Sequence, residues 1–193
     1  MNRQSDQSEF IDSDPGHVRL SEPRAEWAGL FASERQRLAA ISGGAFTNIV
    51  HFGSTAVPGL RAKPIIDIMA SVAALSAVDA MMPVLLSDGY EPAEAGFVKR
   101  RFLRKQMTSA GVGYHLHIIA DVAWPNKNEL LVRDWLIAHP NVAACYATLK
   151  EALARKHHDD RPAYTAAKSE FLRRVVNDAR RSRGLPPETD WTE

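Results

Sequence analysis

The 193-residue sequence predicts an α+β fold, with one N-terminal helix, a mixed or antiparallel sheet, and a C-terminal helical subdomain. Three observations predict this order. Apolar residues recur at helical spacing over residues 23–41, short apolar runs fill the middle of the chain, and the helical period returns after residue 125. We expect a single domain over residues 17–181, with the sheet core at about 45–122 and the helical part at about 126–181.

The first helix is predicted to start near Ser21, as its N-cap, and to end at Gly43-Gly44. The later elements follow from runs of apolar residues between Gly and Pro signals. Strands are predicted at 48–52, 64–72, 89–91, 98–106 and 112–119, with a helix at 75–86. Further helices are predicted at 128–138, 142–156 and 161–181, because Pro140 and Pro162 separate them.

Both ends of the chain differ in composition from the middle. Residues 1–16 are polar and mildly acidic, which predicts a disordered arm. Residues 182–193 contain one Gly and two Pro, which predicts a frayed tail. No apolar run reaches the roughly 18 residues that span a membrane, and the N-terminus lacks the apolar core of a signal peptide. We therefore expect a cytoplasmic protein without a membrane partner.

The charge balance narrows the choice of partners. Lys and Arg number 24 and Asp and Glu 23, for a formal net charge of +1. This argues against a dedicated nucleic-acid binder, whose domain is usually strongly basic. The single cysteine, Cys145, cannot form an internal disulfide, which fits a reducing compartment.

The segment from residue 51 to residue 68 reads HFGSTAVPGLRAKPIIDI and has the composition of a phosphate-binding turn. Gly53 permits a positive φ or a close backbone approach. Ser54 and Thr55 add hydroxyl groups next to backbone donors, and Lys63 adds a positive charge. The alternative interpretation is an ordinary surface loop rich in Gly and Pro.

Asp67 lies among isoleucines on a strand that otherwise reads as buried. Burying a carboxylate is costly unless it is paired or binds a metal ion. The sequence therefore leaves two interpretations of Asp67. It is a metal ligand or catalytic group, or it is a structural carboxylate bonded to a backbone group or an arginine.

The run YHLHII places His115 and His117 two residues apart on a predicted strand. Both side chains then point to the same face, about 6.5–7 Å apart along the strand. Together with Asp67 they would form a donor set for one divalent ion. Alternatively, one of them faces a phosphate, or both are structural.

The run KRRFLRK at residues 99–105 holds five basic residues. On a strand, Lys99, Arg101 and Lys105 would share one face, and Arg100 and Arg104 the other. The forked guanidinium group suits phosphate, which predicts an anion-binding strand. A charged, solvated edge strand is the alternative.

The runs HFGSTAVPGL, KPIIDI, RRF, HLH, RDWLIAHP and YTAAK together resemble the GrpB family, over about residues 15–178. That family belongs to the nucleotidyltransferase superfamily with the polymerase-β-like fold. The resemblance implies a Gly-Ser turn that holds nucleotide phosphates, and three acids that bind two divalent ions. Gly53-Ser54 matches the turn and Asp67 the first acid. Met69 stands at the second acid position, and the later strand offers histidines in place of the third.

The resemblance also implies roles for individual residues. Phosphate or nucleotide contacts fall to His51, Gly53, Ser54, Thr55, Lys63, Arg101, Lys150, Tyr164 and Lys168. Metal ligation falls to Asp67, His115 and His117, and catalysis to Asp67 and His117. The ion is Mg²⁺, Mn²⁺ or Zn²⁺, and the imidazole ligands put two-ion magnesium chemistry in question. Asp67 could instead act as a general base without a metal.

The resulting hypothesis is a nucleotidyltransferase that moves a nucleotidyl group from a nucleoside triphosphate to an unknown small acceptor. The alternative is a protein of the same fold that binds a nucleotide or phosphometabolite without transferring it. A third reading, an RNA- or DNA-modifying protein that uses residues 99–105, is disfavoured by the near-zero net charge.

Overall fold

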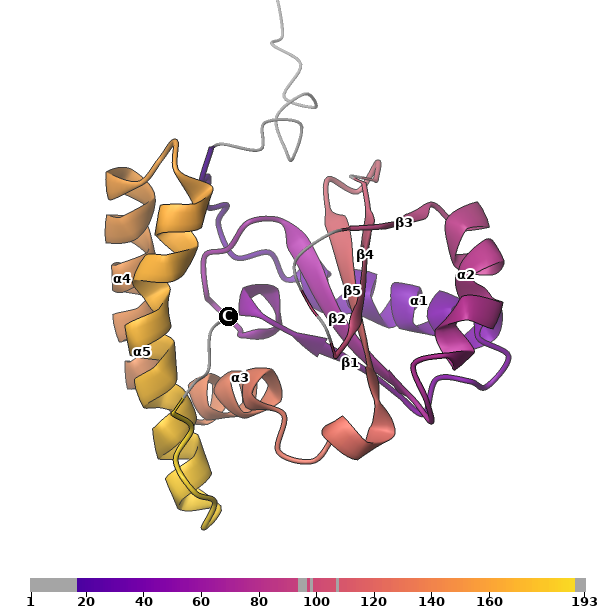
Figure 1. The fold of residues 1–193 in the computed structure, drawn as a ribbon. Helices are drawn as coiled ribbons and strands as arrows, with labels where there is room; N and C mark the ends of the chain where they lie inside the picture. Colours follow the sequence, from indigo (N-terminus) through magenta and orange to yellow (C-terminus); the bar gives the residue numbers. More distant parts are fainter. Residues whose placement is uncertain (1–16, 94–96, 98, 107, 190–193) are drawn as a thin grey trace, which may run out of the picture.

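Five strands form one mixed sheet that lies between two groups of helices (Figure 1). The computed structural model describes residues 17–93, 97, 99–106 and 108–189, so the predicted arm at 1–16 lies outside the described residues. The strands are β1 Asn48–Phe52, β2 Ile65–Val72, β3 Tyr90–Pro92, β4 Arg101–Lys105 and β5 Gly113–Ala120. The helices are α1 Glu26–Ile41, α2 Ala77–Ser87, α3 Asn128–Ala138, α4 Pro140–Lys156 and α5 Arg161–Ser182, with short 3₁₀ turns η2 Ser54–Ala56 and η3 Asp121–Ala123.

The element order agrees with the sequence prediction, and the boundaries differ at a few places. The first helix begins at Glu26 with Ala25 as its N-cap, so Ser21 as N-cap is wrong. Ser21 instead pairs with Ala62 in an isolated β-bridge, because the chain before the helix is extended. Pro140 occupies the first position of α4, where its missing N–H costs no hydrogen bond.

The sheet order is β1-β2-β5-β4-β3, and only the β2–β5 pair is parallel. In the parallel register Asp67 lies opposite His115, and Met69 lies opposite His117. Because side chains alternate along a strand, these four residues share one face of the sheet. That face looks toward α3, α4 and α5.

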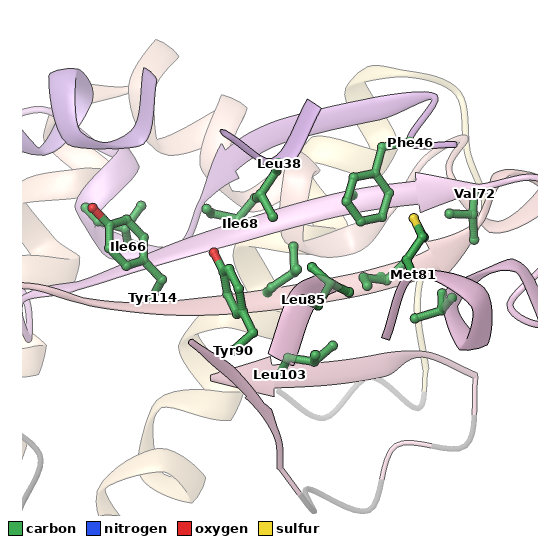
Figure 2. Close-up of a cluster of buried hydrophobic side chains, with 14 of the residues drawn as sticks. Leu38, Phe46, Ile66, Ile68, Val72, Met81, Leu85, Tyr90, Leu103 and Tyr114 are labelled. Carbon is green, nitrogen blue, oxygen red and sulfur yellow. The ribbon is translucent and has the colours of Figure 1, made fainter. Parts of the chain in front are cut away.

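The opposite face of the sheet carries the main apolar core. Ile66 and Ile68 of β2 pack there with Leu116 and Ile118 of β5 and with side chains from α1 and α2, among them Leu38 (Figure 2). All five are completely buried. The two faces of the central strands are therefore chemically distinct, one apolar and one partly polar.

Val57 and Leu60 attach the helical part to the sheet. Both are buried in a second apolar cluster with side chains of α3, α4 and α5, such as Leu136, Tyr146 and Leu172. The same loop therefore forms the turn next to Asp67 and the support for the helices. None of the described helices is both long enough and apolar enough to span a bilayer.

The C-terminal residues after α5 fold back along the helices. Glu188 exchanges hydrogen bonds with the Asn177 side chain, and its carboxylate accepts one from Asn128 Nδ2 at 2.8 Å. Arg180 Nε donates to the Pro186 carbonyl. Residues 183–189, the described part of the tail that the sequence predicts to be frayed, are thus held by side-chain contacts.

A buried charged cluster ties α1 to the edge of the sheet. The Glu34 carboxylate accepts hydrogen bonds from Tyr90 Oη at 2.9 Å and Lys105 Nζ at 3.0 Å. Lys105 also pairs with Asp88 at 2.9 Å. Burial and the Glu34 charge raise the pKa of Tyr90 above its usual value. Removing one partner from such a buried cluster leaves the others poorly compensated.

Lys105→Met should lower the free energy of unfolding by about 2–3 kcal/mol, because Glu34 and Asp88 lose the buried cation that they share and keep the more exposed Arg37. Urea denaturation measures this loss. Arg104→Met is the matched control, since Arg104 is an exposed cation on the same strand and should change stability by less than about 0.5 kcal/mol. Equal effects of the two substitutions would contradict a structural role for the cluster.

Candidate functional site

A cavity of about 430 Å³ lies between the polar face of the sheet and the helices α3, α4 and α5. Ten of the predicted site residues line it: Gly53, Ser54, Thr55, Lys63, Asp67, His115, His117, Lys150, Tyr164 and Lys168. Phe97, Phe102 and Tyr146 supply aromatic walls. The cavity therefore combines a carboxylate and two imidazoles at the sheet with cations at the helical side.

The Gly53 turn presses directly against the Asp67 carboxylate. Gly53 has φ +72°, and a Cβ placed there would lie 2.3 Å from Asp67 Oδ2. Only glycine allows both this conformation and this approach. Thr55 is buried, and its hydroxyl donates to the Ile65 carbonyl at 2.9 Å while its oxygen faces His51 Nε2 at 2.9 Å. The Thr55 hydroxyl thus holds the turn in shape.

Asp67 and His115 form a carboxylate–imidazole pair in the cavity. Asp67 Oδ1 lies 3.2 Å from His115 Nδ1. Burial would raise the pKa of the Asp67 carboxyl, but the hydrogen bond from His115 and the electrostatic attraction to His115, His117 and Lys63 outweigh it. The pKa of Asp67 consequently lies below its usual value, and the group is ionised at neutral pH.

His117 is held by a group that the sequence interpretation missed. Its Nδ1 lies 3.1 Å from Arg100 Nη1, and Arg100 Nη2 donates to Glu129 Oε1 at 2.5 Å. Burial lowers the pKa of His117 to about 4, with Arg100 adding to the shift and Asp67 opposing it. His117 is therefore neutral at physiological pH.

Two predicted phosphate contacts do not lie in the cavity. His51 pairs with Ile68 in the β1–β2 register, so it points to the α1 face, where it stacks on Phe31 with ring centres 4.9 Å apart. Arg101 pairs with Ile118 and also points to that face, 3.9 Å from Asp79. Strand alternation explains both differences. Arg100, one residue earlier, is the arginine of this basic run that lines the cavity.

The helical wall of the cavity holds cations packed over tyrosine rings. Lys150 and Lys168 are both buried, with Nζ 5.4 Å from the Tyr146 ring centre and 5.0 Å from the Tyr164 ring centre. Lys150 Nζ also donates to the Arg61 carbonyl at 2.5 Å. Such desolvated cations attract anions strongly.

Other cavity residues were not among the predicted site residues. Arg133 and Glu129 come from α3, and Arg161 starts α5. Arg133 Nη1 donates to the His51 carbonyl at 2.7 Å, which ties α3 to the end of β1. Arg133 lies within the RDWLIAHP run, and that run was the one signal in the sequence that could have marked it.

Asp67, His115 and His117 offer ligand atoms that all lie within 4.8 Å of one another. His115 Nε2 is buried without a hydrogen-bond partner, which is what a ligand nitrogen would show. The donors suit one divalent ion bound by nitrogen and oxygen. They do not suit two magnesium ions, because Met69 is fully buried in an apolar cluster with Phe52 and Ile119.

The family profile described as "GrpB protein" matches residues 17–178, nearly all of the described chain. The chain belongs to the GrpB family. The UPF0157 protein YqkA of Bacillus subtilis is 35% identical over 157 residues, which cover 81% of this chain and 45% of YqkA. This GrpB chain thus spans about half the length of that relative.

One group of relatives carries a different name. A dephospho-CoA kinase of Mycolicibacterium paratuberculosis is 32% identical over 181 residues, covering 81% of this chain and 44% of that protein. The GrpB sequence therefore occurs as one part of a longer chain with a nucleotide-related name.

Solved structures of other proteins share the fold of this chain. The GrpB protein from Enterococcus faecalis matches with a TM-score of 0.77 and 32% identity, over 86% of this chain and 99% of that one. The poly(A) polymerase complex GLD-2–GLD-3 matches with a TM-score of 0.56 and 13% identity, over 81% of this chain and 54% of that one. The second likeness shows a shared nucleotidyltransferase fold and confirms the α+β prediction.

Gly53→Ala should weaken both the fold and the site, because the new Cβ would strike the Asp67 carboxylate. Gly59→Ala is a matched control, since Gly59 has nearly the same φ, +75°, but open space around its Cα. Each substitution should cost about 1 kcal/mol for the positive φ, and Gly53→Ala about 1–3 kcal/mol more. Urea denaturation measures the difference, and equal losses would contradict the close approach.

The partly buried histidine His51 should make stability fall on acidification. Burial lowers its pKa to about 4, with Asp67 opposing and Arg133 adding to the shift. The unfolded chain takes up a proton near pH 6.5, whereas the folded chain does so only near pH 4. The stability contribution is therefore full above pH 6.5 and is lost as the pH falls toward 4.

Comparing the wild type with His51→Gln isolates this effect. The variant loses the stacking on Phe31 at every pH, so the slope of unfolding free energy against pH is the informative quantity. Between pH 6.5 and 4 the variant should lose stability less steeply than the wild type. Parallel slopes over that window would mean that His51 does not titrate in this way.

Proposed function

We propose that this chain is a nucleotidyltransferase-like enzyme that binds a nucleoside triphosphate and one divalent ion in the cavity and transfers the nucleotidyl group to a small acceptor. The observation that carries the proposal is the Gly53 turn packed against the Asp67–His115 pair, inside a cavity walled by lysines. The shared fold with nucleotidyltransferases and the relatives named as dephospho-CoA kinases support a nucleotide as ligand.

The phosphates would lie between the turn and the helical wall. Backbone N–H groups near Gly53-Ser54 and the Ser54 hydroxyl would donate to phosphate oxygens. Lys63, in the loop between the turn and β2, and Lys150 and Lys168 on the helical side would balance the negative charge. Tyr164 and Thr165 come from the same stretch of α5 and would contact the nucleoside. His51 would act indirectly, through its contact with Thr55.

Asp67, His115 and His117 would hold the divalent ion, which would neutralise charge that develops on the phosphoryl oxygens. Imidazole ligands favour zinc or manganese over magnesium at this position. His117 would alternatively donate a hydrogen bond to a phosphate oxygen from its ring nitrogen.

The nucleotidyl group would be transferred by an in-line displacement. The acceptor hydroxyl oxygen forms a bond to the α-phosphorus, and the bond from that phosphorus to the pyrophosphate oxygen breaks. Pyrophosphate leaves with the electron pair. The hydroxyl proton passes to Asp67 Oδ2, the carboxylate oxygen beside Gly53, while Oδ1 stays with His115.

A second candidate function is favoured by Met69. A fully buried methionine replaces the acid that the superfamily pattern expects, so a second ion has no ligand there. The same cavity would then bind a nucleotide or another phosphorylated metabolite without turnover. Binding measurements and product analysis separate the two functions.

Calorimetric titration with ATP, GTP, CTP and UTP, each with Mg²⁺, Mn²⁺ or Zn²⁺, tests the proposal. We expect at least one triphosphate to bind in a metal-dependent manner, and Asp67→Asn to weaken that binding by about tenfold or more. Asp79→Asn is the control, because Asp79 is 67% exposed on the other face of the sheet and should leave binding unchanged.

Product analysis then follows the bound triphosphate. Released pyrophosphate together with a nucleotidylated acceptor would support transfer, and binding without any pyrophosphate would favour the binding protein. If no triphosphate binds with any ion, both nucleotide functions fail. A loss of stability in Asp67→Asn with unchanged binding would assign Asp67 a structural role.

A further inference from the structure

Arg100 is held rigidly between two parts of the cavity. Its Nη2 donates to Glu129 Oε1 at 2.5 Å, and its guanidinium carbon lies 4.4 Å from the centre of the Phe97 ring. The Arg100 and Glu129 side chains are only 14% and 11% exposed. From this position Arg100 Nη1 reaches His117 Nδ1 at 3.1 Å.

Hydrogen-bond chemistry decides which nitrogen of His117 carries the proton. A guanidinium group only donates hydrogen bonds, so His117 Nδ1 must offer a lone pair to Arg100. In the neutral ring the hydrogen is then on Nε2. Histidines that bind metals show the opposite arrangement, because their second nitrogen usually donates to a carboxylate or a carbonyl.

His115 has a partner of the other kind. Its Nδ1 faces the Asp67 carboxylate, a pure acceptor, while its Nε2 has no hydrogen-bond partner. The two histidines of the YHLHII strand therefore differ, although they lie on the same face only two residues apart. His115 faces a group that only accepts hydrogen bonds, and His117 faces a group that only donates them.

We propose that Arg100 and a divalent ion compete for His117, so that Arg100 sets the metal affinity of the cluster. If Nδ1 ligates the ion, it must give up the lone pair that Arg100 uses. If Nε2 ligates, the proton must move to Nδ1, where Arg100 offers no acceptor. The Arg100–His117 hydrogen bond breaks in both cases. While it is intact, the cluster offers only Asp67 and His115.

This inference deepens the proposed function and rests on its metal site, but not on nucleotidyl transfer. It makes Arg100 a positioning residue for His117. Glu129 takes part through Arg100, since it holds the guanidinium group beside the His117 ring. The Arg100–Glu129 ion pair therefore controls whether His117 can ligate, although neither residue is itself a ligand.

The tautomer of His117 can be observed directly in the wild-type chain. Nitrogen-15 NMR of the imidazole groups, on the metal-free protein near neutral pH, distinguishes a protonated Nε2 from a protonated Nδ1. We expect His117 to carry its proton on Nε2. A proton on Nδ1 would overturn the proposal without any substitution that could disturb the fold.

Cobalt binding to variants tests the competition itself. In Arg100→Gln the amide oxygen can accept from Nδ1–H, so His117 is free to ligate, and Co²⁺ should bind about tenfold more tightly than in the wild type. Arg104→Gln is the control, because it removes the same charge from an exposed position on β4 and should leave Co²⁺ affinity unchanged. Thermal unfolding confirms that each variant is folded.

A double substitution distinguishes the effect of the His117 lone pair on Co²⁺ affinity from the effect of the Arg100 charge. In a His117→Ala background, Arg100→Gln should give no further gain in Co²⁺ affinity. A gain that persists there would come from the lost positive charge and would overturn the proposal. Equal affinity of wild type and Arg100→Gln would also overturn it, while leaving the metal site in place. Absence of Co²⁺ binding in every variant would refute both the competition and the proposed metal site.

Discussion

The parallel pairing of β2 with β5 is the constraint on which the rest of the site depends. It places Asp67 opposite His115 and Met69 opposite His117, all on the face that looks toward the helices. If β2 slipped by one residue, the Asp67 carboxylate would turn into the apolar core, and if β5 slipped, both imidazoles would. The isoleucines at 66 and 68 prevent such a shift, because they fill that core completely. The apolar face of the sheet thus positions the polar one.

The loop that follows β1 is the second feature that determines the shape of the cavity. Gly53 approaches Asp67 where no other residue could, and Val57 and Leu60 lie in the core of the helical part a few positions later. One short segment therefore forms a wall of the cavity and also attaches the helices that close it. This dual role explains why a long run of small and apolar residues surrounds the turn.

Sequence reasoning predicted the order of elements, because local patterns determine it, and ten of its twelve candidate site residues line the cavity. The two-residue period of a strand was enough to put His115 and His117 on one face. Register is not a local property, however, so His51 and Arg101 were assigned to the cavity although they point to the opposite face. The pairing of Arg100 with Glu129 joins residues 29 positions apart. Only the packing of α3 against the sheet brings them together.

We infer that Asp67 and the two histidines form a site for one divalent ion, where the superfamily pattern implies two. Diffraction from crystals grown with Mn²⁺, measured for anomalous scattering of manganese, tests this most directly. We expect a single manganese peak per chain, bonded to Asp67 and at least one of His115 and His117. Two peaks in the cavity, or a peak that none of these side chains contacts, would contradict it.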